Sequence, residues 1–342
     1  MIYAWHTIFC GAYFYFGSVH GGDAFEYYDA SITSNHEFSF GTVFVIIFTK
    51  LFSVGLNLSV FNIFLIFNIF GVIGLIAFNG SLNILTINKS RKIQIFSSII
   101  IFLPSISFWS SAIGKDGLAF MATCLSLWAM TNIRRRYFMV VFSVVTMLLV
   151  RPHIAAILVT SIFIAASFDR KIPPAQRFSI GFLAFCCAAT MIPLALTYSG
   201  VTDDDNQVGD ISEYINKKQE ANQEGDGAID ISSMNPPMQL FSYIFRPLPF
   251  EAHSLTSFAA SIDNLLLLLL FLLGGQTFFK NKGEKLVKQP VSYLAILFFS
   301  IISLAILAST TANSGIAVRQ KWMFLPMIIF LIFSIIEKPR IK

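Results

Sequence analysis

The chain has 342 residues, of which 55% are hydrophobic and only 13% are charged, and its mean hydropathy is +0.70. Soluble globular proteins carry roughly 25% charged residues, so this composition excludes a water-soluble enzyme, a disordered tail and a disulfide-bonded scaffold. A net charge of +5 would suggest nucleic acid in a soluble protein, but in a membrane protein the position of the charges matters more than their sum. We therefore expect an all-α polytopic membrane protein that forms a single transmembrane domain over residues 1–342 and has no nucleic-acid partner.

Hydrophobic segments long enough to span a membrane recur along the whole chain. A spanning helix needs about 20 apolar residues to cross a hydrocarbon core of about 30 Å. We predict ten spans. The longer ones are 58–79, 93–113, 178–199, 262–279, 291–310 and 321–336. The shorter ones are 2–17, 117–133, 137–150 and 154–168.

The basic residues predict the orientation, because cytoplasmic loops carry an excess of Lys and Arg. Sixteen of the 24 Lys and Arg residues, with only three acids, lie in five segments at 89–92, 134–136, 169–177, 280–288 and 337–342. These segments follow every second predicted span, so an alternating topology places all five on one side of the membrane. We expect both termini in the cytoplasm.

We do not predict a membrane span in two segments on the outer side. The first outer loop, 18–57, contains the apolar segment 41–56, which carries Lys50 and would break the alternation if it crossed the membrane. We predict an amphipathic helix at the outer interface there. The hydrophilic stretch 200–240 has nine acids, two lysines and few apolar residues, which predicts a mobile outer flap.

The start of the chain and its cysteines carry less information. Met1 leads almost directly into apolar sequence without a basic region, which argues against a signal peptide and is compatible with a start upstream. The four cysteines lie in apolar stretches without a CxxC pair or a Cys/His cluster, so we interpret them as small buried hydrophobes rather than as metal ligands or bridges.

The charges that topology does not explain collect on the predicted outer side. In the first outer loop, Gly21 and Gly22 permit a tight turn, and Asp23 follows at the expected N-cap of a helix. Glu26 lies three residues further on, so both carboxylates can share a helix face. Such a pair suits general-base work or metal binding; the alternative is a plain N-cap beside a solvated acid.

Further polar residues stand at the outer ends of the middle spans. Lys115 and Asp116 follow Gly114 in a tight turn, where a simple polar cap is the alternative interpretation. Only 14 residues separate Arg136 from Arg151, about 21 Å of helix against a core of about 30 Å. Unless the side chains snorkel, Arg151 and His153 therefore lie in a water-filled recess below the outer surface.

The last outer segments add more cations. Arg246, Glu251 and His253 lie in a proline-stiffened segment that resembles a binding hook, and Arg319 precedes the last span on the outer side, against the positive-inside trend. Arginines from three separate outer segments predict a phosphate ligand, because guanidinium binds phosphate as a fork. The alternative is that they bind anionic lipid headgroups.

These motifs together resemble bacterial membrane proteins of surface-polysaccharide assembly with a GT-C-like architecture, and in particular the polymerase-type members. The resemblance covers nearly the whole chain and is carried by short motifs, which are Gly22-Asp23 to Tyr27-Tyr28, Phe108 to Ser111 with Gly114-Lys115-Asp116, Arg151-Pro152-His153, and Asn313, Gly315 and Arg319. The chain departs from the commoner acidic pair of the superfamily and from the large soluble C-terminal domain of many of its enzymes.

The resemblance implies a glycosyltransferase or polysaccharide polymerase of O-antigen or capsule biosynthesis, in a bacterial cytoplasmic (inner) membrane. It implies a polyprenyl-(di)phosphate-linked sugar donor, a saccharide acceptor, membrane lipids as partners and a catalytic aspartate at Asp23. A divalent cation is left open as a cofactor. Cations suit the developing charge of a phosphate leaving group, and a carboxylate suits deprotonation of an acceptor hydroxyl. The alternative function is transport of a lipid or a lipid-linked oligosaccharide, although the polar residues cluster at the outer ends of spans rather than at the midplane.

Overall fold

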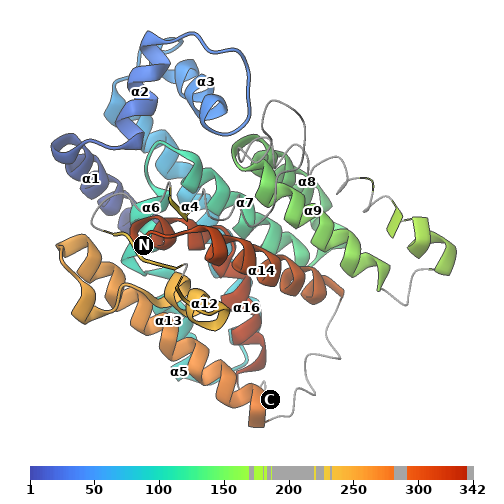
Figure 1. Ribbon diagram of the computed structural model, residues 1–342. Helices are drawn as coiled ribbons and strands as arrows, with labels where there is room; N and C mark the ends of the chain where they lie inside the picture. Colours follow the sequence, from blue (N-terminus) through green and yellow to red (C-terminus); the bar gives the residue numbers. More distant parts are fainter. Residues whose placement is uncertain are drawn as a thin grey trace. The chain divides into compact units, whose positions relative to one another are not determined.

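A computed structural model describes the chain at residues 1–168, 173–179, 181–182, 186, 219–220, 227–231, 233–280 and 291–336. In these residues the regular structure is helical, apart from one isolated antiparallel bridge between Ala228 and Asn313 (Figure 1). The prediction of an all-α protein is therefore confirmed for the described part of the chain.

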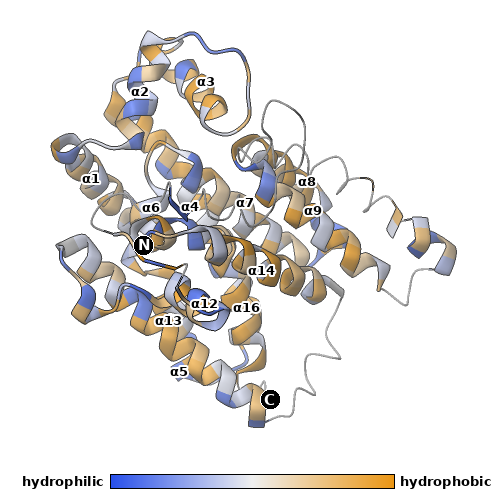
Figure 2. Cartoon of the chain, in the orientation of Figure 1, coloured by the Kyte–Doolittle hydropathy of each residue, from blue (hydrophilic) through white to orange (hydrophobic). Residues whose placement is uncertain are grey.

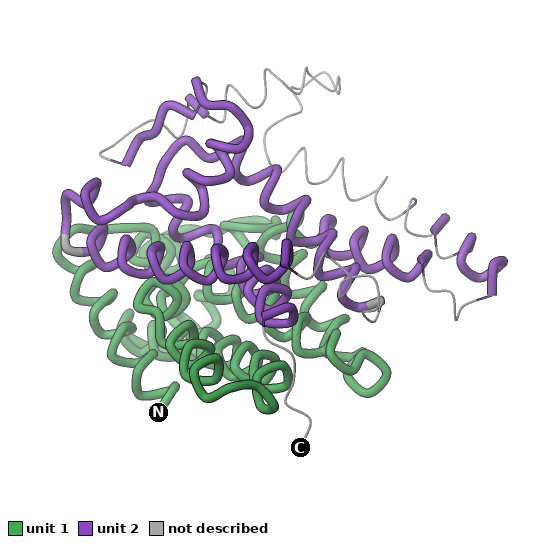
Figure 3. Tube along the Cα trace, turned by 90° about the horizontal axis from the view of Figure 1, so that it is seen from below, with its two compact units in different colours: residues 1–155, 339–342 green, residues 156–338 purple. Residues whose placement is uncertain are grey.

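The chain forms two compact units, the first from Met1 to Ala155 and the second beginning at Ala156 (Figure 3). The helices that lie in the first unit or begin there are α1 (Ile2–His20), α2 (Asp23–Thr33), α3 (Thr42–Ser53), α4 (Val60–Thr86), α5 (Arg91–Ile101), α6 (Pro104–Ser110), α7 (Lys115–Met130), α8 (Ile133–Val150) and α9 (Pro152–Ser167). Those of the second unit are α12 (Pro236–Phe245), η1 (Pro249–Glu251), α13 (Leu255–Lys280), α14 (Val291–Thr310), α15 (Ser314–Gln320), η2 (Lys321–Met323) and α16 (Leu325–Ile335).

Several helices are suited to a membrane by length and composition. Four candidate spans are described, at Val60–Thr86, Arg91–Ser110, Thr256–Lys280 and Ser292–Thr310, and a bent pair from Ser314 to Ile335 makes a fifth if it is one span. Figure 2 shows how apolar residues run along α13 and α14. These helices are those of a membrane-embedded protein. The full set of ten spans stays a prediction, and predicted span 178–199 lies largely outside the described residues.

Two predicted spans are interrupted rather than continuous. Segment 93–113 divides into α5 and α6, because Pro104 cannot donate an N–H to the preceding turn and Leu103 before it is extended. The last predicted span, 321–336, comprises η2 and α16, and the helical segment Ser314–Met323 meets Leu325–Ile335 at 64°. Phe324 between them leaves helical geometry, and a proline again stands in the first turn that follows.

Glycines let α4 and α7 pack closely in the first unit. A Cβ on Gly74 would lie 2.8 Å from Cδ1 of Phe120, and one on Gly80 would lie 3.3 Å from Nε1 of Trp128. Small residues at such positions allow two helix backbones to approach. Because residue numbers increase together along both helices, α4 and α7 run parallel, as the alternating topology requires of the spans 58–79 and 117–133.

The predicted first outer loop, 18–57, contains the two helices α2 and α3 (Figure 1). The helix predicted over 41–56 is present as the shorter α3, whose interfacial position stays a prediction, and Oγ of Ser53 lies 2.7 Å from Oγ of Ser31 on α2. Gly21 and Gly22 have positive φ angles of 75° and 139°, which confirms the predicted turn. The N-cap of α2 is Gly22, however, so the prediction of Asp23 as N-cap is wrong by one residue.

The C-terminal part of the predicted flap 200–240 is held in place. The N–H of Ser314 donates to the carbonyl of Gly227 at 2.8 Å, and the N–H of Ile229 donates to the carbonyl of Ala312 at 2.8 Å. Helix α12 then begins at Pro236, with Asn235 as its side-chain cap. Residues 227–231 and 233–240 of the predicted flap are thus described as structured, and most of 200–226 lies outside the described residues.

Candidate functional site

An ion pair between two helix ends forms the centre of the candidate site in the first unit. Arg151 follows the last residue of α8, Asp116 lies in the first turn of α7, and Nη2 of Arg151 is 2.8 Å from Oδ1 of Asp116. The arginine is 7% exposed, and its Nε is buried without a hydrogen-bond partner among the described residues. The side chain is buried within its unit; the predicted water-filled recess below the outer surface stays a prediction.

The beginning of α3 adjoins this ion pair from another direction. Nζ of Lys115 donates to Oγ1 of Thr42 at 3.0 Å, and the N–H of Gly41 donates to the carbonyl of Leu149 at 2.8 Å. Helix α3 is therefore attached both to the start of α7 and to the end of α8.

Three helix N-termini meet at this point, those of α3, α7 and α9. Helix α3 begins at Thr42, α7 at Lys115, and α9 at Pro152 beside Arg151. Neither α3 nor α7 has a side chain that caps its first N–H groups. Uncapped N-termini carry partial positive charge and free N–H donors, which attract anions such as phosphate. Because Asp116 neutralises the charge of Arg151, the net positive charge here comes from Lys115 and the helix N-termini, and we call this group of residues the cationic corner.

The predicted acidic helix lies against the same corner. A Cβ on Gly114 would lie 3.6 Å from Cε2 of Tyr27, so α2 adjoins the N-terminus of α7. Asp23 stands one helical turn before Tyr27 and shares its face of α2. Asp23 is partly buried, whereas Glu26 is exposed. Of the two predicted carboxylates, Asp23 is thus the one on the side of α2 that carries the contact.

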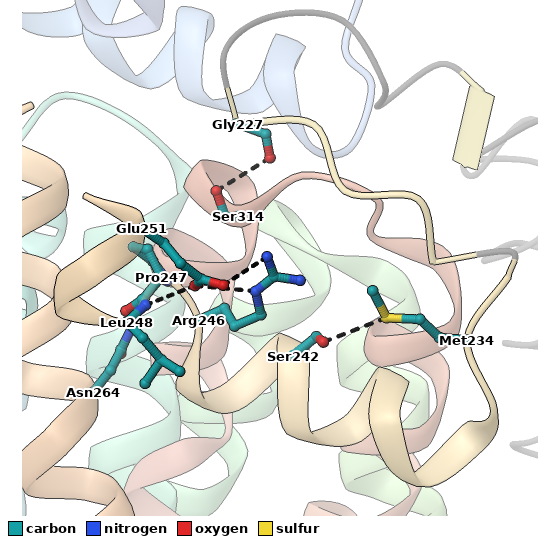
Figure 4. A network of polar contacts seen from close by, with 9 residues as sticks. All are labelled: Gly227, Met234, Ser242, Arg246, Pro247, Leu248, Glu251, Asn264 and Ser314. Carbon is teal, nitrogen blue, oxygen red and sulfur yellow. Dashed lines mark hydrogen bonds and ion pairs between the residues drawn. The ribbon is translucent and has the colours of Figure 1, made fainter. Parts of the chain in front are cut away.

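A second group of polar residues lies in the second unit, around the turn between α12 and α13 (Figure 4). Arg246 and Glu251 form a two-bonded ion pair, with Nη2 to Oε1 at 2.8 Å and Nε to Oε2 at 3.1 Å. The N–H of Leu248 donates to the same Oε2 at 2.8 Å. We call residues Arg246–His253 the hook, since the prolines and this ion pair fix its course.

The hook is tied to the rest of its unit by a buried lysine. Nζ of Lys321 is fully buried, donates to the carbonyl of Ile244 at 3.1 Å and bonds to Oδ1 of Asn264. Nδ2 of Asn264 in turn donates to the carbonyl of Pro247 at 3.0 Å. These bonds connect the break in the last helix to both sides of Arg246.

Glu251 is ionised more readily than an ordinary carboxyl group. Partial burial raises its pKa, but the hydrogen bond and positive charge of Arg246 and the Leu248 N–H outweigh that effect, and His253 adds a smaller attraction. The net result is a pKa below the ordinary value, so the carboxylate is charged at neutral pH.

The remaining predicted residues are distributed between the two units. His153 is partly buried in the second residue of α9, His253 is exposed at the end of the hook, and Arg319 is partly buried in the last turn of α15. Arg151 belongs to the first unit, and Arg246 and Arg319 belong to the second. A single phosphate cavity that joins all three arginines therefore stays a prediction.

Two polar centres were missed by reasoning from the sequence. His6 is buried inside the first unit, where its Nδ1 bonds to Asn68 and its Nε2 lies 2.9 Å from Oγ of Ser110. Asn264 in the second unit is fully buried beside Lys321. The only signal was a polar residue inside an apolar stretch, which does not identify the partner.

No cluster of three or more His, Cys, Asp or Glu side chains suited to a metal ion occurs in the part of the chain that the structure describes. No protein-family profile, curated protein or solved structure matches the chain.

Proposed function

We propose that the protein transfers sugars, or polymerises saccharide repeat units, from a polyprenyl-(di)phosphate-linked donor at the outer face of the cytoplasmic membrane. The observation that carries the proposal is the cationic corner of the first unit, where Lys115 and Arg151 adjoin the uncapped N-termini of α3 and α7 beside the helix of Asp23. A site of this composition suits a phosphate leaving group next to a general base.

The proposed mechanism uses residues of the chain only. The donor phosphate accepts hydrogen bonds from Lys115, from Arg151 and from the N–H groups of the first turns of α3 and α7. Asp23 takes the proton of the acceptor hydroxyl as its oxygen attacks the anomeric carbon of the donor. The bond from that carbon to the phosphate oxygen breaks, and the cations stabilise the charge left on the (di)phosphate.

The test is an assay on the purified full chain in lipid, with a polyprenyl-diphosphate-linked oligosaccharide as substrate. Chain growth supports a polymerase, and a single addition supports a transferase. Addition of a chelator to the same reaction tests whether a divalent cation is required. Absence of any transfer from either lipid-linked (di)phosphate or monophosphate donors would overturn the proposal.

The assigned base is tested by Asp23→Asn, with Asp29→Asn as the matched control because Asp29 is exposed on the same helix. We expect Asp23→Asn to lower turnover about 100-fold or more, the usual scale for a positioned acid–base group, while Asp29→Asn stays near wild type. If Glu26→Gln abolishes turnover and Asp23→Asn does not, the two carboxylates exchange roles.

The alternative function, transport of a lipid or lipid-linked oligosaccharide, is favoured by one observation. The last helix is broken at Phe324, beside the buried Lys321, and interrupted helices form the substrate sites of many transporters. Movement of a fluorescent lipid-linked oligosaccharide across reconstituted vesicles, without formation of a new glycosidic bond, would favour transport over transfer.

A further inference from the structure

The hook has the wrong charge for the phosphate ligand that its arginine suggested. The guanidinium of Arg246 and the carboxylate of Glu251 neutralise each other through two hydrogen bonds. A phosphate would have to compete with this carboxylate for the same nitrogen atoms, and it would be repelled by the Glu251 charge. An uncharged ligand meets no such repulsion and can use the remaining donors and acceptors of the pair.

The polar atoms of the hook are held in fixed positions before any ligand binds. The Leu248 N–H holds Oε2 of Glu251, and Asn264 and Lys321 hold the carbonyls of Pro247 and Ile244 (Figure 4). Ordering these groups costs no further conformational entropy on binding, which favours recognition of a specific polar ligand. Arg246 and Glu251 nevertheless stay reachable, with side chains 26% and 23% exposed.

An exposed aromatic residue directly precedes Glu251 in the chain. Phe250, in the 3-10 turn directly before Glu251, is 81% exposed, and His253 at the end of the hook is exposed as well. One exposed phenylalanine is unremarkable by itself. An exposed ring in the same short segment as preorganised, electrically neutral hydrogen-bonding groups suits a sugar, because sugars have apolar C–H faces and a rim of uncharged hydroxyls.

We propose that the hook is a saccharide-binding subsite, in which one uncharged sugar of the acceptor stacks on Phe250 and bonds through its hydroxyls to Arg246, Glu251 and His253. This inference rests on the proposed function, to which it adds the location and chemical class of the acceptor site. The uncharged acceptor sugar would then bind to residues of the second unit, and the donor phosphate to residues of the first unit.

The test is direct binding of free glycans to the full chain in lipid nanodiscs, on a printed array of bacterial surface oligosaccharides that carry neither lipid nor phosphate. We expect wild type to retain at least one oligosaccharide, and Phe250→Ala and Glu251→Gln each to weaken that binding about tenfold or more. Phe258→Ala is the control, because Phe258 is exposed on α13 outside the hook. Equal binding by wild type and Phe250→Ala, or no glycan bound by wild type, overturns the subsite.

Two further measurements separate the possible failures. Glycan binding that is lost in Phe250→Ala but kept in Asp23→Asn supports the subsite even if no transfer is ever observed. Turnover that needs Asp23 but shows an unchanged acceptor KM in Phe250→Ala overturns the subsite and leaves the transfer reaction intact. Quenching of a Phe250→Trp variant by brominated lipids would assign the ring to the membrane and would also overturn the subsite.

Discussion

Arg151 and Asp116 stand 35 residues apart in the chain and meet as a largely buried ion pair with side chains 9% and 17% exposed. A hydrogen bond between charged groups contributes about 1.5–3 kcal/mol when it is shielded from water. Arg151→Met should therefore destabilise the protein by about that amount, measured as the loss in free energy of unfolding in detergent.

Arg151→Lys distinguishes charge from shape at this position. The ammonium keeps the charge but loses the planar fork that bonds Asp116 and a phosphate together. We expect Arg151→Lys to recover part of the stability lost in Arg151→Met while turnover stays at least about tenfold below wild type, the equivalent of about 1.4 kcal/mol. Full turnover in Arg151→Lys would show that the arginine has only an electrostatic role.

The Arg246–Glu251 pair predicts a pH dependence of stability. The pKa of Glu251 in the folded protein is lower than in the unfolded chain, so the pair stabilises the fold at every pH above the unfolded value of about 4.3. This contribution is lost as the pH falls through the lower, folded pKa. Thermal unfolding between pH 6 and pH 3 should thus show a decline in Tm that is smaller in Glu251→Gln, whereas an equal decline in both proteins contradicts the assignment.

At the scale of elements, the parallel packing of α4 and α7 depends on the absence of a side chain at Gly74. A Cβ there would lie 2.8 Å from Cδ1 of Phe120 and 3.0 Å from Cα of Met121, and the backbone of α7 cannot give way as a flexible side chain does. Gly74→Ala should destabilise the first unit by about 1–3 kcal/mol, as overpacking does.

Gly11→Ala on α1 is the matched control, because a Cβ at that position meets nothing within 4 Å. Alanine favours helix over glycine by about 1 kcal/mol, so the Tm of Gly11→Ala should equal or exceed that of wild type. An unchanged Tm in Gly74→Ala would contradict the close packing of α4 and α7, and a lower Tm in Gly11→Ala would contradict the open space around Gly11 on α1.

The apolar helices were predictable from the sequence because length and hydropathy are local properties. Segments 58–79, 262–279 and 291–310 correspond to α4, α13 and α14, and segment 41–56 corresponds to α3. The breaks at Leu103 and Phe324 were missed, although a proline follows each of them, because hydropathy does not register a change in backbone direction.

The polar contacts were much less predictable, because they join residues far apart in the chain. Lys115 and Thr42 are 73 residues apart, His6 and Ser110 are 104 apart, and Lys321 and Ile244 are 77 apart. The predicted topology singled out Arg151 and Asp116 as candidate site residues, since placing a charged side chain at the end of a span costs free energy unless a partner balances it. It could not indicate that Arg246 is neutralised by Glu251, which depends on the turn geometry of the hook.

At the scale of the whole molecule, the predicted topology of ten spans with cytoplasmic termini can be tested by cysteine labelling. His36 lies in the predicted first outer loop and Arg135 in a predicted inner loop, and both side chains are exposed in the first unit. In a variant without the native cysteines, a membrane-impermeant thiol reagent applied to intact cells should label His36→Cys and leave Arg135→Cys unlabelled until the membrane is permeabilised.

Ser232→Cys and Asn281→Cys extend the same test to the remainder of the chain, with labelling from outside expected only at position 232. Both positions lie outside the described residues, so the labelling tests the charge pattern independently of the structure. The parallel course of α4 and α7 requires that 134–136 lie on the same side of the membrane as 89–92. Labelling of Arg135→Cys in intact cells would therefore place both of these basic segments outside. The cationic corner beside Asp23 would then face the cytoplasm, where the donor would have to be a cytoplasmic activated sugar, and the proposed polymerisation at the outer face would fail with it.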